Sequence, residues 1–366
     1  MMWFETPATH WEGIWGAHWT MATRDPNVLG ADGRRQIASH FYPLIGPYAS
    51  RDPTVIEWQL RLMKTAGISG VLIDWYGVNT TNKDLLAIAE SADVLVAAIA
   101  SSGLEFAFVL EDRFATSVLE VRMNVRYLAA TYFAHPSYAR SSRTGEPYLL
   151  LFGPLTVLAP SAWTTVLEGI EPVSLITLDG KSAHVGSLAD GEFGWPFADK
   201  NESERADHVA VVESFYLHAA TLPHAIGVVY PGFDDFYHEG GTEAGLFHIP
   251  YANGTTLAVT TDLARRFSDR VDMVQVATWK WARLTDMKLP SLVDYLVLPP
   301  GAQQLLVPVP SCTRPNALCT PCVHLPILAR ELADLCALAD LPTRVPVTTT
   351  RARWLSPRLS EATPRY

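Results

Sequence analysis

The sequence predicts an α/β fold: a (β/α)8 barrel of the TIM type, incomplete at its first strand and after its seventh. Two observations predict it. The chain has 366 residues, of which 48% are hydrophobic and 18% charged, so it can bury a large core. Its first 279 residues alternate short apolar runs with longer helical patterns, as repeated units of a strand followed by a helix do. A barrel of this kind forms one domain at this length.

Six apolar runs have the length of strands that are buried on both faces. They are residues 71–73, 106–110, 148–152, 175–178, 226–230 and 273–277. The gaps between neighbouring runs are long enough for a crossover helix each time. We expect the first strand of the barrel to come from residues 1–4 and the eighth from residues 292–298.

Helical patterns fill the gaps. In the clearest one, Asp52 suits the N-cap and Pro53 the first helical position. An apolar stripe follows, with a glycine where the helix should end: Ile56, Leu60, Met63 and Gly67. Further helices are expected near 83–101, 117–134, 204–221 and 255–267.

The charge pattern excludes several classes of partner. The net charge is −10 and no run of Lys or Arg interrupts it, which argues against nucleic acid or an anionic membrane. No stretch reaches the roughly 18 uninterrupted apolar residues of a membrane span. The first twenty residues hold four Trp, two Glu and two His, which is not the pattern of a signal peptide.

The composition changes after Trp279. Residues 280–366 carry 10 Lys and Arg against 6 Asp and Glu, a balance of +4, which leaves −14 for residues 1–279. The same stretch holds 12 of the 26 prolines, all four cysteines and a single glycine. We therefore divide the chain into a barrel over 1–279 and an atypical, poorly ordered tail over 280–366.

Polar and aromatic residues follow most of the predicted strands. Because the carboxyl ends of parallel strands meet at one mouth of a barrel, they indicate a site there. The alternatives are that each carboxylate caps the next helix and that each tryptophan packs in the core. The candidates are Asp74, Trp75, Tyr76, Glu111, Asp112, Tyr230, Asp234, Asp235 and Trp279.

Paired carboxylates with many aromatic rings are typical of a carbohydrate cleft. Cleavage of a glycosidic bond commonly uses two carboxylates on either side of the sugar, one as an acid and one as a base or nucleophile. Aromatic rings stack on the apolar faces of sugars, and the chain has 11 Trp and 13 Tyr. The sequence therefore favours an oligosaccharide or polysaccharide as partner.

Metal and cofactor motifs are weak. His10, His18 and His40 with Glu5 lack the helical H-x-x-x-H spacing, so a metal-dependent hydrolase remains a minor alternative. One C-x-x-C pair, Cys319 and Cys322, has no second pair. No phosphate loop or dinucleotide fingerprint is present, so no cofactor is expected. Three N-x-S/T sequons are compatible with secretion: Asn79, Asn201 and Asn253.

Several blocks of sequence resemble glycoside hydrolase families 71 and 99. The first is His40-Phe41-Tyr42-Pro43-Leu44-Ile45-Gly46-Pro47-Tyr48, followed by Asp52-Pro53 and by residues 62–77, which end in Ile73-Asp74-Trp75-Tyr76-Gly77. The second is Tyr230-Pro231-Gly232-Phe233-Asp234-Asp235-Phe236-Tyr237, and the third is Thr278-Trp279. The resemblance spans about residues 3 to 279.

This resemblance implies a (β/α)8 barrel related, at greater distance, to fungal α-1,3-glucanases and endo-α-mannosidases. The implied activity is internal hydrolysis of an α-linked glycan without a cofactor. In the mannosidase branch, the 2-hydroxyl of the sugar itself takes the part of the enzyme nucleophile. His40 and Tyr42 in the first block join the mouth residues as expected substrate-binding positions.

One departure from the families concerns catalysis. Their motif continues after the tryptophan as W-N-D or W-N-E and supplies catalytic acids, whereas Trp279 here precedes Lys280-Trp281-Ala282-Arg283. No carboxylate appears until Asp286, so the families' catalytic pair has no counterpart. We expect Asp74 and Glu111 to bind sugar hydroxyls or to do the residual acid and base work.

Two hypotheses explain this departure. One is a truncated start together with a reading-frame error near codon 280. The other is a pseudoenzyme, a barrel that binds carbohydrate without cleaving it.

Overall fold

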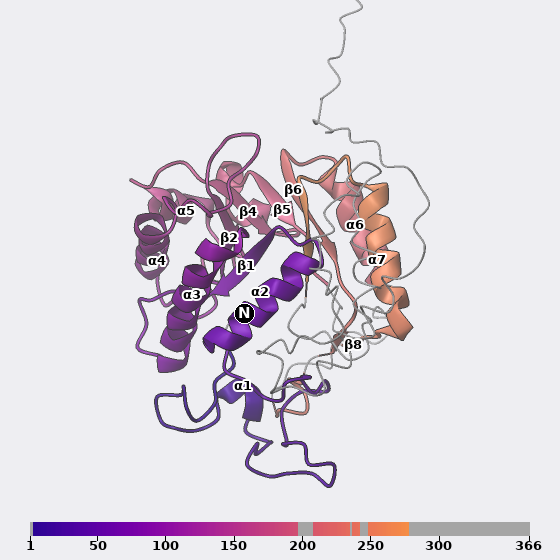
Figure 1. Cartoon of the computed structure of the whole chain (residues 1–366). Helices are drawn as coiled ribbons and strands as arrows, with labels where there is room; N and C mark the ends of the chain where they lie inside the picture. The colour runs from indigo at the N-terminus through magenta and orange to yellow at the C-terminus, as the bar shows by residue number, and fades with distance from the viewer. Residues whose placement is uncertain (1–2, 197–207, 235, 242–247, 278–366) are drawn as a thin grey trace, which may run out of the picture. The chain divides into compact units, whose positions relative to one another are not determined.

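The computed structural model describes residues 3–196, 208–234, 236–241 and 248–277 (Figure 1). All of them belong to one unit, Met1–Leu296. In these ranges seven strands form a parallel sheet in the order β1-β2-β3-β4-β5-β6-β9. They are β1 (Gly70–Trp75), β2 (Glu105–Leu110), β3 (Tyr148–Leu151), β4 (Ser174–Leu178), β5 (Gly191–Phe193), β6 (His224–Val229) and β9 (Met273–Val276). A two-stranded antiparallel ribbon pairs β7 (Phe233–Asp234) with β8 (His248–Ile249).

Helices connect most of the strands and pack around the curled sheet (Figure 1). They are α1 (Ala17–Thr20), α2 (Pro53–Thr65), α3 (Lys83–Ser102), α4 (Val118–Thr131), α5 (Pro160–Leu167), α6 (His208–Ala219) and α7 (Thr255–Arg266). Short 3-10 turns lie at Ser182–His184, Gly186–Leu188 and Ala252–Gly254. The fold is thus an incomplete (β/α)8 barrel, as the sequence predicts.

Local sequence signals set the ends of the helices. The carboxylate of Asp52 accepts hydrogen bonds from the backbone N–H groups of Thr54 (2.8 Å) and Val55 (3.4 Å), and Pro53 opens α2. Gly67 follows the end of α2 with φ +77°, a left-handed conformation that glycine adopts without steric cost. The predicted start and end of this helix are confirmed.

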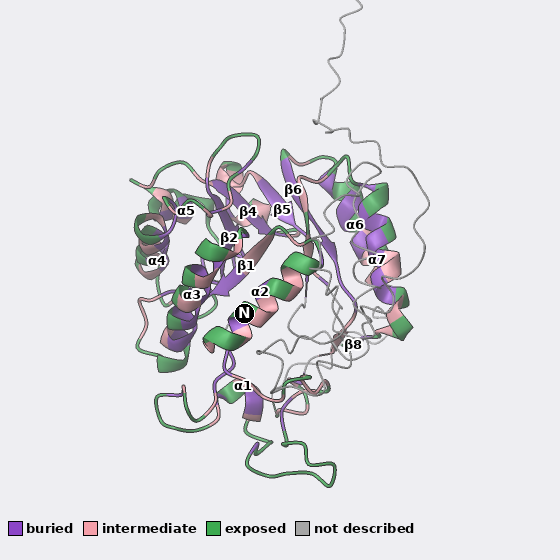
Figure 2. Ribbon diagram, in the orientation of Figure 1, coloured by how far each residue is buried: buried purple, intermediate pink, exposed green. Residues whose placement is uncertain are grey.

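The largest core lies between the sheet and the outer helices. Figure 2 shows β2 to β6 mostly buried, β1 buried only toward its end, and the helices buried on the side that faces the sheet. Apolar residues of β1 to β4 contact the inner faces of α2 to α5. A second core joins β6 to α6 and α7. Because the strands are buried on both faces, they read as continuous apolar runs.

Strand β5 and helix α5 of the barrel were not predicted from the sequence, nor were the short elements α1, β7 and β8. Strand β5 has three residues and carries a buried glutamate, Glu192, so it has no apolar run. That carboxylate accepts hydrogen bonds from the N–H groups of Gly180 and Ser182, both 3.0 Å, and lies 3.2 Å from Nε2 of His218 on α6. Helix α5 has eight residues and begins after Ala159, which makes no side-chain cap.

The expected first strand is wrong where it can be examined. Trp3 and Phe4 belong to no strand, and the sheet among the described residues begins at β1. Instead, the N–H of Phe4 donates to Oγ of Ser50 (2.9 Å), and the N–H of Ser50 donates to the carbonyl oxygen of Phe4 (2.7 Å). The expected eighth strand and the whole tail from Lys280 lie outside the described residues.

Helix α3 is the one helix among the described residues that is long and apolar enough to cross a membrane. Half of its apolar window is buried within the fold, where Ala92, Val96 and Ile99 pack into the core with β2. A core helix passes the same test of length and composition, so the finding is weak evidence for a membrane span.

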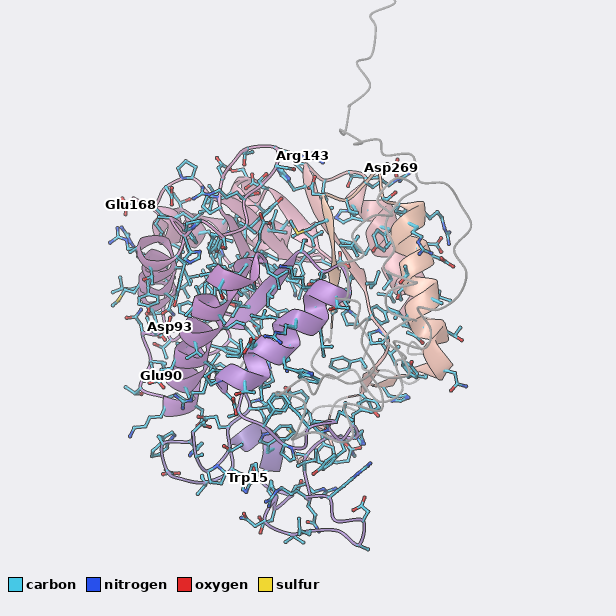
Figure 3. All side chains as sticks on the ribbon, in the orientation of Figure 1. Trp15, Glu90, Asp93, Arg143, Glu168 and Asp269 are labelled. Carbon is cyan, nitrogen blue, oxygen red and sulfur yellow. The ribbon has the colours of Figure 1, made fainter. Side chains whose placement is uncertain are left out.

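An ion-pair network ties the amino-terminal ends of the strands. Asp272, just before β9, lies 2.7 Å from Nη2 of Arg143 and 3.1 Å from Nδ1 of His224 at the start of β6. Figure 3 shows Arg143 at one end of this unit and Trp15, from the amino-terminal segment, at the other. Polar groups at the amino-terminal ends of barrel strands stabilise the fold, whereas sites lie at the carboxyl ends.

Candidate active site

The amino-terminal segment packs against the carboxyl end of β1. The ring of Trp3 lies 4.0 Å from that of His18 on α1 and 6.0 Å from that of Tyr76, the residue after β1. Trp3 and Tyr76 are both buried, with Leu85 and Ile88 of α3 beside them. This segment therefore forms part of one wall of the barrel mouth.

Asp74, Tyr76 and Glu111 meet at this mouth. The Tyr76 hydroxyl lies 3.5 Å from Oδ2 of Asp74 and also hydrogen-bonds the Glu111 carboxyl group. The charge of Asp74 also acts on Glu111, so the two acids lie within electrostatic reach of each other. All three side chains are buried. The structure thus brings together both expected acid and base residues and one expected binding residue.

Burial and charge favour the protonated form of Glu111. Burial, followed by the charge of Asp74, raises the pKa of Glu111 to about 7, although the guanidinium of Arg113 lowers it. Nε of Arg113 lies 2.8 Å from Oε1 of Glu111. Burial and both carboxylates also raise the pKa of the Tyr76 phenol. Near neutral pH the site therefore holds a carboxylic acid that can donate a proton.

The carboxylate of Asp112 faces the protein backbone. It accepts hydrogen bonds from the N–H groups of Leu155 (2.7 Å), Thr156 (3.0 Å) and Val157 (2.8 Å). These bonds join the loop after β2 to the loop after β3. Asp112 is expected to bind substrate, and in this structure both of its carboxylate oxygens accept from the backbone.

Two aromatic residues expected at the mouth lie in the core instead. Trp75 has no exposed surface and packs against Phe108 and Tyr127, because neighbouring strand residues point to opposite faces and Asp74 takes the mouth side. Tyr230 is equally buried in the core beside α6 and α7, and its hydroxyl lies 3.0 Å from Nδ1 of His208. Neither ring is available to a ligand.

His40 and Asp234 meet in a second polar cluster. Nε2 of His40 lies 3.7 Å from Oδ1 of Asp234 and 3.3 Å from Oε1 of Glu239. Oδ1 of Asp234 also lies 3.3 Å from Nδ1 of His248 on β8. The charge of Tyr237, from the same segment, contributes to the raised pKa of Tyr76. The segment that carries Asp234 thus comes within electrostatic reach of Tyr76 through Tyr237.

Tyr42, another expected binding residue, packs within the amino-terminal segment. The Tyr42 hydroxyl accepts a hydrogen bond from the N–H of Arg35, and its ring packs under the guanidinium of Arg34. Tyr42 is thus a packing residue of the amino-terminal segment in this structure. Asp235 and Trp279 lie outside the described residues.

Glu5, His10 and Asp84 form the one group of metal-ligating side chains found close together among the described residues. Nδ1 of His10 accepts a hydrogen bond from the N–H of Glu12 (3.1 Å), so the proton of neutral His10 sits on Nε2. That nitrogen faces Asp84 at 3.6 Å, and Nη2 of Arg51 lies 2.9 Å from Glu5. Arg51 and His10 thus supply ion-pair partners for the carboxylates of this group.

Arg113 and Phe114 were not assigned to the site from the sequence. They follow Asp112 in the loop after β2, and Phe114 packs against Tyr76. Their position directly after an acidic pair at a strand end was the available signal. Neither residue type indicates a role in a site without the contact that the fold creates.

Comparison with known proteins decides the family. The model of glycosyl hydrolase family 99 matches residues 3–218, more than half of the chain. The chain belongs to glycosyl hydrolase family 99. The matched range includes the acid pair and the amino-terminal segment beside it, so both lie within the part of the chain that matches the family.

Curated relatives match over part of their length. A glycoprotein endo-alpha-1,2-mannosidase-like protein of Danio rerio is 26% identical over 205 residues, which are 52% of this chain and 43% of that protein. Glycoprotein endo-alpha-1,2-mannosidase of Rattus norvegicus is 28% identical over 203 residues, 52% of this chain and 40% of that protein. The alignments thus span about two fifths of these relatives.

Solved structures share the fold. A family 99 endo-alpha-mannosidase from Bacteroides thetaiotaomicron, in complex with bis-tris-propane, superposes with a TM-score of 0.57 at 20% identity. The superposition covers 76% of this chain and 81% of that one. At this identity the similarity establishes the barrel fold of the family.

Proposed function

We propose that the chain acts on α-linked glycans of the mannose type, with the sugar bound at the mouth beside Asp74, Tyr76 and Glu111. The observation that carries the proposal is the acid pair joined through one tyrosine hydroxyl at the carboxyl ends of β1 and β2. Family membership and the mannosidase names of the relatives support the substrate class.

In this proposal Glu111 is the acid. Protonated below about pH 7, it donates its proton to the glycosidic oxygen as the bond to the sugar breaks. Water adds to the anomeric carbon in place of the leaving group, and Asp74, held beside the Tyr76 hydroxyl, accepts the proton that this water loses or binds sugar hydroxyls. Burial strengthens these interactions because little water competes with them.

We expect hydrolysis to be slow. Glycosidases commonly use two carboxylates placed on either side of the scissile bond, and the stretch Lys280-Trp281-Ala282-Arg283 stands where the family motif supplies acids. Loss of a positioned acid or base typically lowers the rate by about 10² to 10⁴. A carbohydrate-binding barrel without turnover is therefore the second candidate function, and this stretch is the observation that favours it.

One experiment tests both candidates. Binding and release of reducing sugar are measured with an α-1,2-linked mannose oligosaccharide for the wild type, Glu111→Gln and Asp74→Asn. Glu57→Gln, an exposed change on α2, is the control. The first candidate predicts slow release that falls above pH 7 and drops at least about 100-fold in Glu111→Gln.

The outcomes separate the candidates. Tight binding with no release in any protein supports the binding barrel. Release that is unchanged in Glu111→Gln removes Glu111 from the mechanism. Absence of binding by the wild type overturns the mannose proposal.

A further inference from the structure

Phe114 places a large apolar surface in solvent next to the acid pair. Its side chain is 51% exposed, although aromatic rings of this size contribute most when buried. The ring packs on that of Tyr76, with 5.4 Å between centroids and 54° between planes. Tyr76 is the residue whose hydroxyl contacts both Asp74 and Glu111. Phe114 is therefore one residue removed from the proposed reacting groups.

Phe114 is also the exposed end of a row of rings that contact one another at tilted angles. In this ring row His18 packs on Trp3 at 4.0 Å, Trp3 on Tyr76 at 6.0 Å, and Tyr76 on Phe114 at 5.4 Å. Trp3 and Tyr76 are buried, which fixes the inner face of the Phe114 ring. The exposed surface of Phe114 therefore has a defined direction beside the mouth.

The loop that presents Phe114 is held firmly on both sides. Asp112 binds three backbone N–H groups of the neighbouring loop. Arg113 is ion-paired to Glu111 at 2.8 Å, and its backbone carbonyl lies 3.5 Å from Oγ1 of Thr156. A ring that is already fixed loses little conformational entropy when a ligand packs on it. The loop thus has the preorganisation of a binding surface.

The chemistry of the surroundings identifies the occupant. A pyranose ring has an apolar face of C–H groups and an edge of hydroxyls. Phe114 offers a flat apolar surface with no polar atom, while Arg113, Asp74 and Glu111 offer hydrogen-bond donors and acceptors within the same site. An apolar ring flanked by a few convergent polar groups is the usual composition of a sugar-binding site.

We propose that Phe114 is the stacking platform for the sugar ring that neighbours the one bound at Asp74 and Glu111. The proposal rests on the proposed function and deepens it, because it places a second sugar in the site. A longer oligosaccharide then gains affinity from Phe114, and a monosaccharide does not. Phe114 is a positioning residue, since it binds the glycan without taking part in bond cleavage.

The test measures affinity by titration calorimetry for an α-1,2-linked mannose tetrasaccharide and for mannose alone. The variants are Phe114→Ala, Phe114→Trp and, as the control, Leu217→Ala, a 54% exposed side chain on α6. We expect Phe114→Ala to weaken tetrasaccharide binding about tenfold or more and to leave mannose binding unchanged. Phe114→Trp should keep the affinity, and the control should match the wild type.

Two results would overturn the proposal. If the wild type binds the tetrasaccharide and Phe114→Ala binds it equally well, the platform is refuted while the proposed function stands. If the wild type does not bind the tetrasaccharide, the proposed function fails and the platform fails with it. Unfolding midpoints of the variants are recorded beside each titration. If Phe114→Trp binds as weakly as Phe114→Ala and both midpoints are lowered, the loss of affinity comes from unfolding and also counts against the platform.

Discussion

At the scale of single residues, the acid pair stores an unfavourable charge interaction. Glu111 is 4% exposed and lies near Asp74, so ionising it in the folded protein costs free energy that the unfolded chain does not incur. Arg113 offsets part of this cost. A site of this kind is less stable than a purely apolar one, and functional sites are where such a cost is commonly found.

The first prediction concerns this cost. Because the pKa of Glu111 is raised from 4.5 to about 7 on folding, its stabilising contribution is fully present below pH 4.5 and is lost as the pH rises to about 7. At about 1.4 kcal/mol per pKa unit, the loss is about 3 kcal/mol. The Glu111→Gln variant lacks this loss, so its stability relative to the wild type should rise between pH 4.5 and pH 8. Urea unfolding of both proteins at pH 4.5 and pH 8 measures the difference in their free energies of unfolding. If this difference is the same at the two pH values, the pKa of Glu111 is not raised on folding.

A second prediction concerns Asp112. The Asp112→Ala substitution removes the acceptor of three N–H groups, of which that of Val157 is buried and those of Leu155 and Thr156 are only partly buried, which should cost about 2 kcal/mol in the free energy of unfolding. Glu57→Ala, which removes an exposed pair with Arg61 on α2, should cost at most about 0.5 kcal/mol. Urea midpoints of the two variants provide the comparison, and similar midpoints would show that these hydrogen bonds of Asp112 do not stabilise the fold.

At the scale of elements, the short strand β5 is held by fit with its neighbour. A side chain at Gly191 would overlap the backbone oxygen of His224 on β6. At Gly67, after α2, a Cβ atom meets nothing within 4 Å. The two glycines therefore serve different purposes: close approach of two strands and a left-handed turn.

The third prediction follows from this contrast. Gly191→Ala should destabilise the barrel by more than about 3 kcal/mol, because two backbones would have to separate. Gly67→Ala should cost about 1 kcal/mol, the strain of a left-handed alanine. Hydrogen exchange of β5 and β6 amides checks the first effect locally. Equal costs for the two substitutions would show that β5 and β6 are not packed as described.

The success of prediction also varied by element. Helix α2 was predictable because its cap, first proline, apolar stripe and final glycine are all local signals. Strand β5 was not predictable, because three residues with a central Glu192 carry no periodicity. The burial of this glutamate is offset by its contacts with His218 and with two backbone N–H groups. Such partners come from other parts of the chain.

At the scale of the whole molecule, the change after Trp279 remains to be explained. We propose a reading-frame change near codon 280, because charge, glycine use and cysteine use all alter near one point. The fourth prediction is that the transcript, sequenced across codons 275–290, encodes an acidic W-N-D or W-N-E continuation in another frame. An unbroken message encoding Lys280 onward, with protein of 40.3 kDa in cells, would contradict it.

By itself, the sequence determined the barrel class, most of the strands, and Asp74 and Glu111 as candidate acids, because strand runs and the residues that follow them are local patterns. Only the tertiary structure decided which neighbours face the mouth. Trp75 and Asp112 adjoin the two acids in sequence, yet one packs in the core and the other binds a neighbouring loop. Phe114 acquires its proposed role solely from contact with Tyr76. The direction of a side chain depends on strand pairing and packing, which bring together residues far apart in the chain.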